Sequence, residues 1–270
     1  MRFSALVLTQ DEERHAADCL RSLAPAERIV VIDSGSTDRT CEIAAAVAGV
    51  EVVRRAFVSF ADQRNAGLRM FPPGTWVLHL DADERLTPEL AEELATLEPG
   101  ADVPAYNVPS RVSFGGRYLL RAAGYPVYQT RLTRAGEFEF EEVGHGQKAP
   151  ERYGPLPRLR HPYDHLPFEK GLEEWRHRHE RYAEKEAQSL IGRRSQVPWS
   201  AWRDPIQRRR WLRQRTAFLP GRPWIVWLYL LVGRWGWLDG PPGWEYCRRR
   251  RVFEMMVDRH LRRLRPADGR

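Results

Sequence analysis

The chain of 270 residues is 42% hydrophobic and 29% charged, which permits a sizeable core and excludes disorder or a collagen-like architecture for the whole. Its three cysteines are too few for a disulfide framework or a four-thiolate zinc site, and they indicate a reducing compartment. The net charge of +7 is unevenly distributed: residues 196–270 hold 17 arginines and 6 acids, a net +11, and residues 1–195 are net −4. The sequence predicts a mildly acidic domain and a basic extension, with a boundary near residue 195.

The first 80 residues alternate short β-branched runs with segments of helical periodicity. Strands are expected at residues 3–8, 29–32, 50–53 and 76–80, and helices at residues 12–23, 40–48 and 61–70. This alternation predicts a parallel sheet flanked by helices, in which ligands bind beyond the carboxyl ends of the strands. Residues 106–140 alternate apolar and polar side chains, which predicts added antiparallel strands, and residues 172–190 have the pattern of a polar helix.

The strongest local feature is a buried strand that ends in two carboxylates, Asp81 and Asp83. In an extended backbone residues i and i+2 point the same way, so both side chains could reach one cation. A hard divalent ion, Mn²⁺ or Mg²⁺, would then neutralise a bound diphosphate. The alternative is structural: Asp83 caps the helix that begins near Pro88, and Asp81 has no ligand role.

Four polar segments agree in order, spacing and structural context. They are TQDEE at residues 9–13, DSGSTDRT at 33–40, QRNAG at 63–67 and DAD at 81–83. With these segments, residues 1–145 resemble the family 2 glycosyltransferases, whose GT-A (Rossmann-like) fold is a mixed, mostly parallel sheet with helices on both faces. The extended segments at 60–66 and 81–85, and GWLDG at 236–240, are similar to the bacterial lipopolysaccharide-core glucosyltransferase-like branch.

The resemblance implies a nucleotide-sugar donor, a UDP-sugar above all, bound with Mn²⁺ or Mg²⁺. The residues that it implies are Thr9, Glu13, Asp33, Arg64 and Asp81 for the nucleotide, and Asp81, Asp83 and His161 for the metal. Structural roles are the alternatives. Asp33 could cap a helix, Glu13 and Arg64 could lie on solvated helix faces, and His161 could be a hydrogen-bonded structural histidine.

The acceptor side departs from the family pattern. Inverting enzymes of this family place a carboxylate base in the second half of the domain, and the candidates here are Glu142, Glu141 and His145. Relatives often carry an acid where this chain has Val127, and a glutamate where Gly146 follows the histidine. The alternative is that the two glutamates belong to a solvated turn.

The extension combines arginine runs at 208–210 and 248–251 with an apolar segment at 224–233. Ten apolar residues are half of the about 20 that a membrane-spanning helix needs. Eight of the ten tryptophans also lie beyond residue 195. Tryptophan and arginine favour the headgroup region, so the extension is expected to be helical and to contact the membrane peripherally. A packed helical subdomain, or a homodimer interface, is the alternative.

The expected function is an inverting, metal-dependent transfer of a hexose, with glucose suggested by the branch, to a lipid-linked or lipopolysaccharide-type glycan acceptor. No secretory signal pattern is seen in residues 1–8, so the expected location is cytoplasmic, at the inner face of the cell membrane. A nucleotidyltransferase would carry a glycine-rich basic loop where residues 9–13 are acidic. Nucleic-acid binding by the extension and a non-catalytic, degenerate glycosyltransferase are further alternatives; nucleic acid is not an expected partner.

Overall fold

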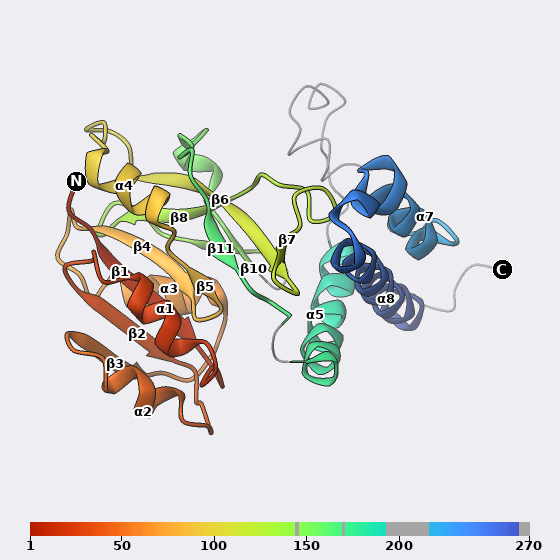
Figure 1. Ribbon diagram of the computed structural model, residues 1–270, viewed down its shortest axis with the longest axis horizontal. Coiled ribbons are helices and arrows are strands. Elements are labelled where there is room, and N and C mark those ends of the chain that lie inside the picture. The colour runs from red at the N-terminus through yellow and green to blue at the C-terminus, as the bar shows by residue number, and fades with distance from the viewer. Residues whose placement is uncertain (144–145, 169–170, 193–215, 265–270) are drawn as a thin grey trace. The chain divides into compact units, whose positions relative to one another are not determined.

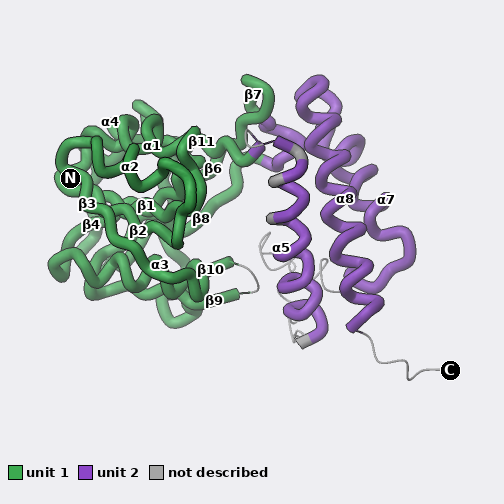
Figure 2. Tube along the Cα trace, turned by 90° about the horizontal axis from the view of Figure 1, so that it is seen from below, with its two compact units in different colours: residues 1–118, 125–167 green, residues 119–124, 168–270 purple. Residues whose placement is uncertain are grey.

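The computed structural model describes residues 1–143, 146–168, 171–192 and 216–264 (Figure 1). The chain divides into two compact units (Figure 2). Unit 1 comprises residues 1–118 and 125–167, and unit 2 comprises residues 119–124 and 168–270. The helix α5 (Leu172–Gly192) belongs to unit 2, so the helical unit begins before the boundary expected near residue 195.

Nine strands of the described residues form the mixed sheet of unit 1, in the order β3-β2-β1-β4-β8-β6-β11-β5, with β7 paired to β6. The strands β3, β2, β1 and β4 are mutually parallel, and β8 pairs with β4 in the antiparallel direction. The strands are β1 (Ser4–Thr9), β2 (Ile29–Asp33), β3 (Val50–Arg54), β4 (Trp76–Asp81), β5 (Glu84–Arg85), β6 (Ala105–Phe114), β7 (Arg117–Tyr118), β8 (Val127–Arg134) and β11 (Tyr163–His165).

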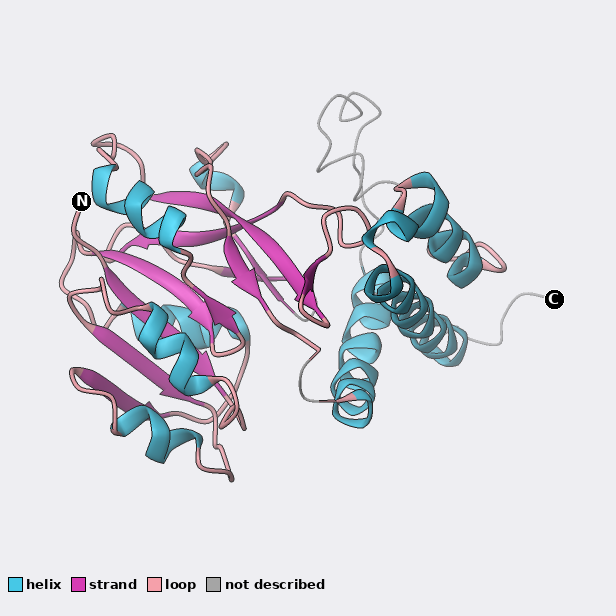
Figure 3. Ribbon diagram, in the orientation of Figure 1, coloured by secondary structure: helices cyan, strands magenta, loops and turns pink. Residues whose placement is uncertain are grey.

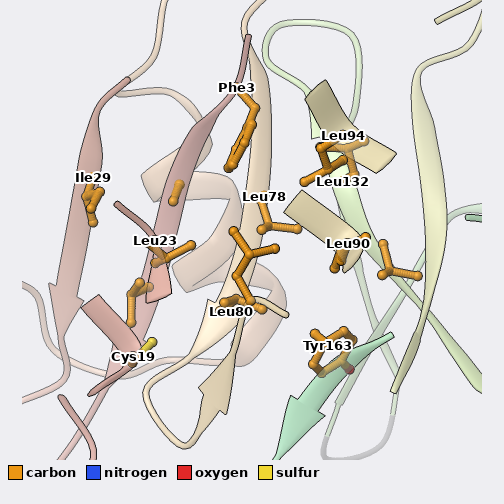
Figure 4. Close-up of a cluster of buried hydrophobic side chains, with 14 of the residues drawn as sticks. Phe3, Cys19, Leu23, Ile29, Leu78, Leu80, Leu90, Leu94, Leu132 and Tyr163 are labelled. Carbon is orange, nitrogen blue, oxygen red and sulfur yellow. The ribbon is translucent and has the colours of Figure 1, made fainter. Parts of the chain in front are cut away.

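The helices of unit 1 cover both faces of this sheet (Figure 3). The helices α2 and α3 begin within one residue of the expected positions, whereas α1 begins at Ala16, four residues after the expected start at residue 12. Along β1, Ala5 and Val7 join the core beneath α1, α2 and α4, whereas Leu6 and Leu8 join the core beneath α3. Figure 4 shows the first of these cores. The helices are α1 (Ala16–Ser22), α2 (Thr40–Ala45), α3 (Phe60–Leu68) and α4 (Pro88–Thr96), with a 3-10 turn η1 (Glu151–Tyr153).

Side-chain caps fix two of these helices. The hydroxyl of Ser59 accepts a hydrogen bond from the backbone N–H of Asp62 at the start of α3. The hydroxyl of Thr87 accepts one from Leu90 at the start of α4, where Pro88 suits the first turn. The cap of α4 is therefore Thr87, and not Asp83 as the structural alternative for that acid required.

Gly67 lets α3 lie close to the sheet. A Cβ atom there would stand 2.5 Å from Cδ1 of Leu6 and 2.8 Å from Cδ1 of Ile32, both fully buried side chains. We expect Gly67→Ala to lower the free energy of unfolding by about 1–3 kcal/mol, because overpacking outweighs the helix propensity of alanine. Calorimetry of the full chain measures this change. Gly146→Ala is the control, since its nearest atom lies at 3.9 Å; equal destabilisation by both variants would contradict the close-packing explanation.

A separate two-stranded sheet, β9 (Glu141–Val143) with β10 (Gly146–Lys148), lies against α3. The strand β9 carries Glu141 and Glu142, the two glutamates predicted as candidates for the base that acts on the acceptor. The predicted α/β class is confirmed: the sheet is mixed, its N-terminal half is parallel, and antiparallel strands follow.

Unit 2 is helical, as expected. Its core joins Trp175 and Ala183 of α5 to Phe253 and Val257 of α8. Residues 119–124 belong to it because a carboxylate oxygen of Asp239 accepts the backbone N–H groups of Arg121 and Ala122, at 3.0 and 2.8 Å. Besides α5, its elements are α7 (Arg222–Leu228), the π-helical turn η3 (Tyr229–Gly233), the 3-10 turn η4 (Gly236–Asp239) and α8 (Pro241–Leu264). None of the helices in the described ranges is long and apolar enough to cross a membrane.

Candidate active site

Three polar strand ends meet at one edge of the parallel half-sheet. Thr9 pairs with Asp33 across β1 and β2, and Leu8 pairs with Asp81 across β1 and β4. The carboxyl ends of these neighbouring strands therefore place Thr9, Asp33 and Asp81 side by side. This is the position at which open α/β sheets bind ligands.

The loops that follow β1 and β2 are joined by side-chain hydrogen bonds. The backbone N–H groups of Asp11 and Glu12 donate to the hydroxyls of Ser36 and Thr40, at 2.8 and 2.7 Å. In return, the Asp11 carboxylate accepts the backbone N–H of Thr37 at 2.7 Å. Two loops far apart in sequence thus form one rim above the strand ends.

Two acids fix the loop that follows β2: Asp33 at the end of the strand and Asp38 before α2. Asp33 is fully buried, and one of its carboxylate oxygens accepts the N–H groups of Gly35 and Ser36 at 3.0 Å each. Asp38 accepts the N–H of Thr40 at the start of α2, also at 3.0 Å. Asp38 is therefore the acid at the helix start, while Asp33 holds the turn between strand and helix.

The two residues predicted to line the base pocket differ in environment. The Thr9 hydroxyl is buried and makes no hydrogen bond within the described part of the chain. Glu13 is exposed, and its carboxylate accepts the backbone N–H of Arg39 at 3.3 Å. A buried hydroxyl without a partner at a strand end is an atom that a ligand or a water molecule can satisfy.

Asp81 belongs to a buried ionic cluster. Its two carboxylate oxygens accept from Nη2 of Arg64 at 2.7 Å and from Nη2 of Arg131 at 3.1 Å. Arg131 also contacts Glu84 at 2.6 Å and the Tyr163 hydroxyl at 3.3 Å. Glu84 in turn accepts the backbone N–H of Asp81 at 2.9 Å and so closes the turn after β4.

The cluster balances two cations against two carboxylates. Burial opposes the ionisation of Asp81, but Arg64 and Arg131 outweigh it and hold the pKa of Asp81 below its ordinary value. Burial raises the pKa of Glu84 to about 7, against the attraction of Arg131. The charge of Asp81 is therefore compensated by two buried arginines, and the Asp83 carboxylate of the same turn contacts neither of them in the described part of the chain.

Asp83 lies beside a histidine, but not the one that was expected. Nε2 of His165 is 3.5 Å from Oδ2 of Asp83, whereas His161 is half-exposed and its Nδ1 lies 3.1 Å from Glu93. The backbone explains the difference, because β11 pairs His165 with Glu84 and the N–H of Leu166 bonds the carbonyl of Asp83. His165 thus replaces His161 as the histidine of this site.

The segment QRNAG on α3 has a supporting role in the structure. Arg64 is fully buried and pairs with Asp81, which excludes the solvated helix face that was its structural alternative; its contact with a phosphate or base stays a prediction. Asn65 exchanges two hydrogen bonds with the backbone of Phe140, at 2.9 and 2.8 Å. These two side chains position Asp81 and the segment that leads into β9.

The acceptor-side candidates are only partly within the described residues. Glu141 and Glu142 are exposed on β9, and Glu141 pairs with Lys148 at 3.5 Å. His145 lies outside the described residues. The register of the hairpin places Glu142 opposite Gln147, which carries no charge.

Sequence reasoning missed Arg131, Glu84 and Tyr163. Glu84 belongs to the acidic segment at residues 81–85. Its position directly after Asp83 was the feature that could have indicated a role in the site. Arg131 and Tyr163 gave no comparable signal, because each is a single residue of β8 or β11 and meets Asp81 or Glu84 only through the fold of the sheet.

The donor atoms at this turn suit a divalent cation that also binds its substrate. Carboxylate oxygens and an imidazole nitrogen are ordinary ligands of Mn²⁺, and Mg²⁺ accepts one or two carboxylates together with phosphate oxygens. Within the described ranges, no three acidic, histidine or cysteine side chains are grouped closely enough to hold an ion by themselves. Asp83 with His165 therefore fits a cation whose remaining ligands come from a bound diphosphate.

Fold and site together define an α/β protein with an acidic turn beyond parallel strands, the arrangement of a GT-A transferase. The sequence model of the family described as Glycosyl transferase family 2 matches residues 4–146. The chain therefore belongs to this family.

Curated relatives match over shorter stretches. An uncharacterized glycosyltransferase of Rickettsia typhi is 31% identical over 94 residues, 34% of this chain and 32% of the relative. The lipopolysaccharide core biosynthesis glycosyltransferase LpsC of Rhizobium meliloti is 32% identical over 103 residues, 37% of this chain and 38% of the relative. The matches thus span about a third of the length of these relatives.

Two solved structures are similar at low identity. Glucosyl-3-phosphoglycerate synthase from Mycobacterium tuberculosis, in complex with Mn²⁺, UDP and glucosyl-3-phosphoglycerate, is 22% identical with a TM-score of 0.33, covering 42% of this chain and 45% of that one. TarS residues 1–349 of S. aureus is 15% identical with a TM-score of 0.42, covering 99% of this chain and 93% of that one.

Proposed function

We propose that the protein is a glycosyltransferase that transfers a hexose from a nucleoside-diphosphate sugar, with inversion, to a lipid-linked or lipopolysaccharide-type glycan. The observation that carries the proposal is the turn after β4, in which Asp83 lies 3.5 Å from His165 of β11. Family membership supports the reaction class. The name of the relative LpsC supports an acceptor of the lipopolysaccharide core type.

Each part of the site has a role in this proposal. The joined loops after β1 and β2 receive the nucleoside, with the Thr9 hydroxyl as a hydrogen-bonding group and the buried Asp33 as the residue that fixes the turn. Asp83 and His165 hold the divalent cation. Arg64 and Arg131 hold Asp81 ionised and fixed in orientation next to it. A bound Mn²⁺ or Mg²⁺ supplies positive charge to the leaving diphosphate.

A screen of donors tests the proposal. Thermal-shift measurements with UDP-, GDP-, ADP- and dTDP-sugars, each with Mn²⁺ and with a chelator, should show one nucleotide that stabilises the protein only with the metal. At a ligand concentration of 100 Kd the expected stabilisation is about 2.7 kcal/mol. No shift with any donor, or an equal shift in the chelator, would contradict the proposed donor site.

Glu142 is our assignment for the base that removes the acceptor proton. We expect Glu142→Gln to lower kcat roughly a hundredfold or more, the usual contribution of a general base, and to leave donor binding unchanged. Glu141→Gln is the matched control, because Glu141 is the neighbouring glutamate on the same short strand and pairs with Lys148. If both variants keep full activity, the base is a different residue.

A further inference from the structure

Unit 2 exposes a continuous set of large apolar side chains on α7 and η3. Their exposed fractions lie between 52% and 58%, well above those of core residues. We call them the α7–η3 apolar surface: Trp224, Ile225, Leu228, Tyr229 and Val232. Their spacing of one, three or four residues places them on one side of the helix.

The opposite side of the same helix is already used for packing. Trp227, Leu230 and Leu231 pack with Cys247 of α8 and with Ala122. The helix therefore buries one side within unit 2 and presents the other to the surroundings. No acid lies between residues 222 and 238, so nothing of negative charge within that segment interrupts the apolar surface.

Arginines border this surface on α8. The guanidinium of Arg251 lies 4.0 Å from the ring centroid of Trp224, and a pocket of about 560 Å³ is lined by side chains that include Trp227, Trp244, Glu245, Arg248 and Arg251. Arg248 is paired with Glu245 at 2.7 Å. Arg251 contacts no carboxylate in the described part of the chain, and its Nε makes no hydrogen bond there.

We propose that the α7–η3 apolar surface and this pocket dock unit 2 onto the surface of an anionic lipid bilayer, with a lipid phosphate bound between Arg248 and Arg251. The inference goes beyond the proposed transfer reaction and concerns a surface that is separate from the donor site. Indole rings favour the headgroup level, and guanidinium groups bind phosphate as planar forks. An amphipathic helix with these two features lies in the plane of the bilayer, not across it.

Charge complementarity favours a bilayer over the other occupants. An RNA strand would need a basic groove, but Arg222, the only arginine of α7, is buried and paired with Glu254, and the exposed side of this helix is apolar. A second copy of the chain would bring its own Arg251, which contacts no carboxylate within the described residues, to the interface and would place like charges together. Anionic lipid supplies both hydrocarbon for the apolar side chains and phosphate for the arginines.

Co-sedimentation of the full chain with vesicles tests the inference. Vesicles of phosphatidylglycerol and phosphatidylcholine should bind the protein, and pure phosphatidylcholine should bind it more weakly. Trp224→Glu combined with Leu228→Glu should reduce binding roughly a hundredfold or more, since two buried apolar side chains are lost. Arg251→Glu should reduce it roughly tenfold or more and lower its salt dependence.

Matched controls separate this surface from general electrostatics. Val58→Glu places the same charge on an exposed apolar residue of unit 1, and Arg262→Glu reverses an exposed arginine further along α8. Neither should change binding by more than about twofold, and circular dichroism should show all variants folded. If Arg262→Glu reduced vesicle binding as much as Arg251→Glu, binding would come from general charge attraction. That result would overturn the proposed phosphate site in the pocket.

Two other outcomes would also overturn the proposal. One is absence of vesicle binding together with a concentration-dependent dimer that Trp224→Glu dissociates, which would make the surface a contact between copies. The other is retention of single-stranded RNA, lost in Arg251→Glu, without any binding to vesicles. Because no donor sugar enters these assays, their failure leaves the proposed transfer reaction untouched.

Discussion

Asp83→Asn is expected to lower the rate of sugar transfer roughly a hundred- to thousandfold, because the cation that assists the diphosphate loses its charged protein ligand. The substitution keeps the size of the side chain, and Asp83 makes no cap that α4 depends on. The fold should therefore be retained. The measurement is the release of nucleotide from the donor with acceptor present, over a series of Mn²⁺ concentrations.

Three controls define this result. Asp102→Asn changes an exposed aspartate of a loop and should have no effect on transfer. His165→Ala should raise the Mn²⁺ concentration needed for half-maximal activity, whereas His161→Ala should not, because His161 lies on Glu93. Full activity in Asp83→Asn, or an effect of His161→Ala equal to that of His165→Ala, would contradict the assignment of the metal site.

Arg131→Met is expected to lower the free energy of unfolding by about 3–5 kcal/mol, since it leaves Glu84 and Asp81 short of a cation in the interior. Arg131 is buried and lies within 3.1 Å of both carboxylates. For a unit of this size the expected fall in Tm is roughly 10 °C. Calorimetry of the full chain measures it.

A double substitution distinguishes this charge effect from simple loss of packing. Arg131→Met with Glu84→Gln removes both members of the closest pair and should recover part of the lost stability, a coupling that a mutant cycle measures. Arg21→Met, at an exposed arginine paired with Asp18, should change stability by less than about 1 kcal/mol. Additive losses in the double variant would contradict a coupled ionic cluster.

The parallel half of the sheet could be predicted because its signals are local. The strands β2 and β3 are β-branched runs, α1 and α4 have apolar periodicity, and Asp81 directly follows the apolar run of residues 76–80. The sequence therefore predicts the acidic turn at the edge of the sheet where β4 ends. The basic, tryptophan-rich composition likewise indicated a helical C-terminal unit, and the exposed apolar side of α7 is a property that only the structure adds.

The inner support of the site could not be predicted, because it depends on contacts between distant strands. Arg64 has the sequence setting of a solvated helix residue, and its burial follows from the close approach of α3 that Gly67 permits. Arg131 lies 50 residues from Asp81 in sequence. Whether His161 or His165 lies next to Asp83 depends on the register of β11 against β5. A strand of three residues gives no sequence signal for that register.

The most direct test of the donor site is a calorimetric titration of the protein with UDP, with Mn²⁺ and with a chelator, for the wild type and for Asp83→Asn. We expect Mn²⁺ to strengthen UDP binding to the wild type at least tenfold, about 1.4 kcal/mol, and to have no effect on UDP binding to the variant. Equal affinity of the wild type in Mn²⁺ and in chelator, or an unchanged Mn²⁺ effect in Asp83→Asn, would contradict this expectation.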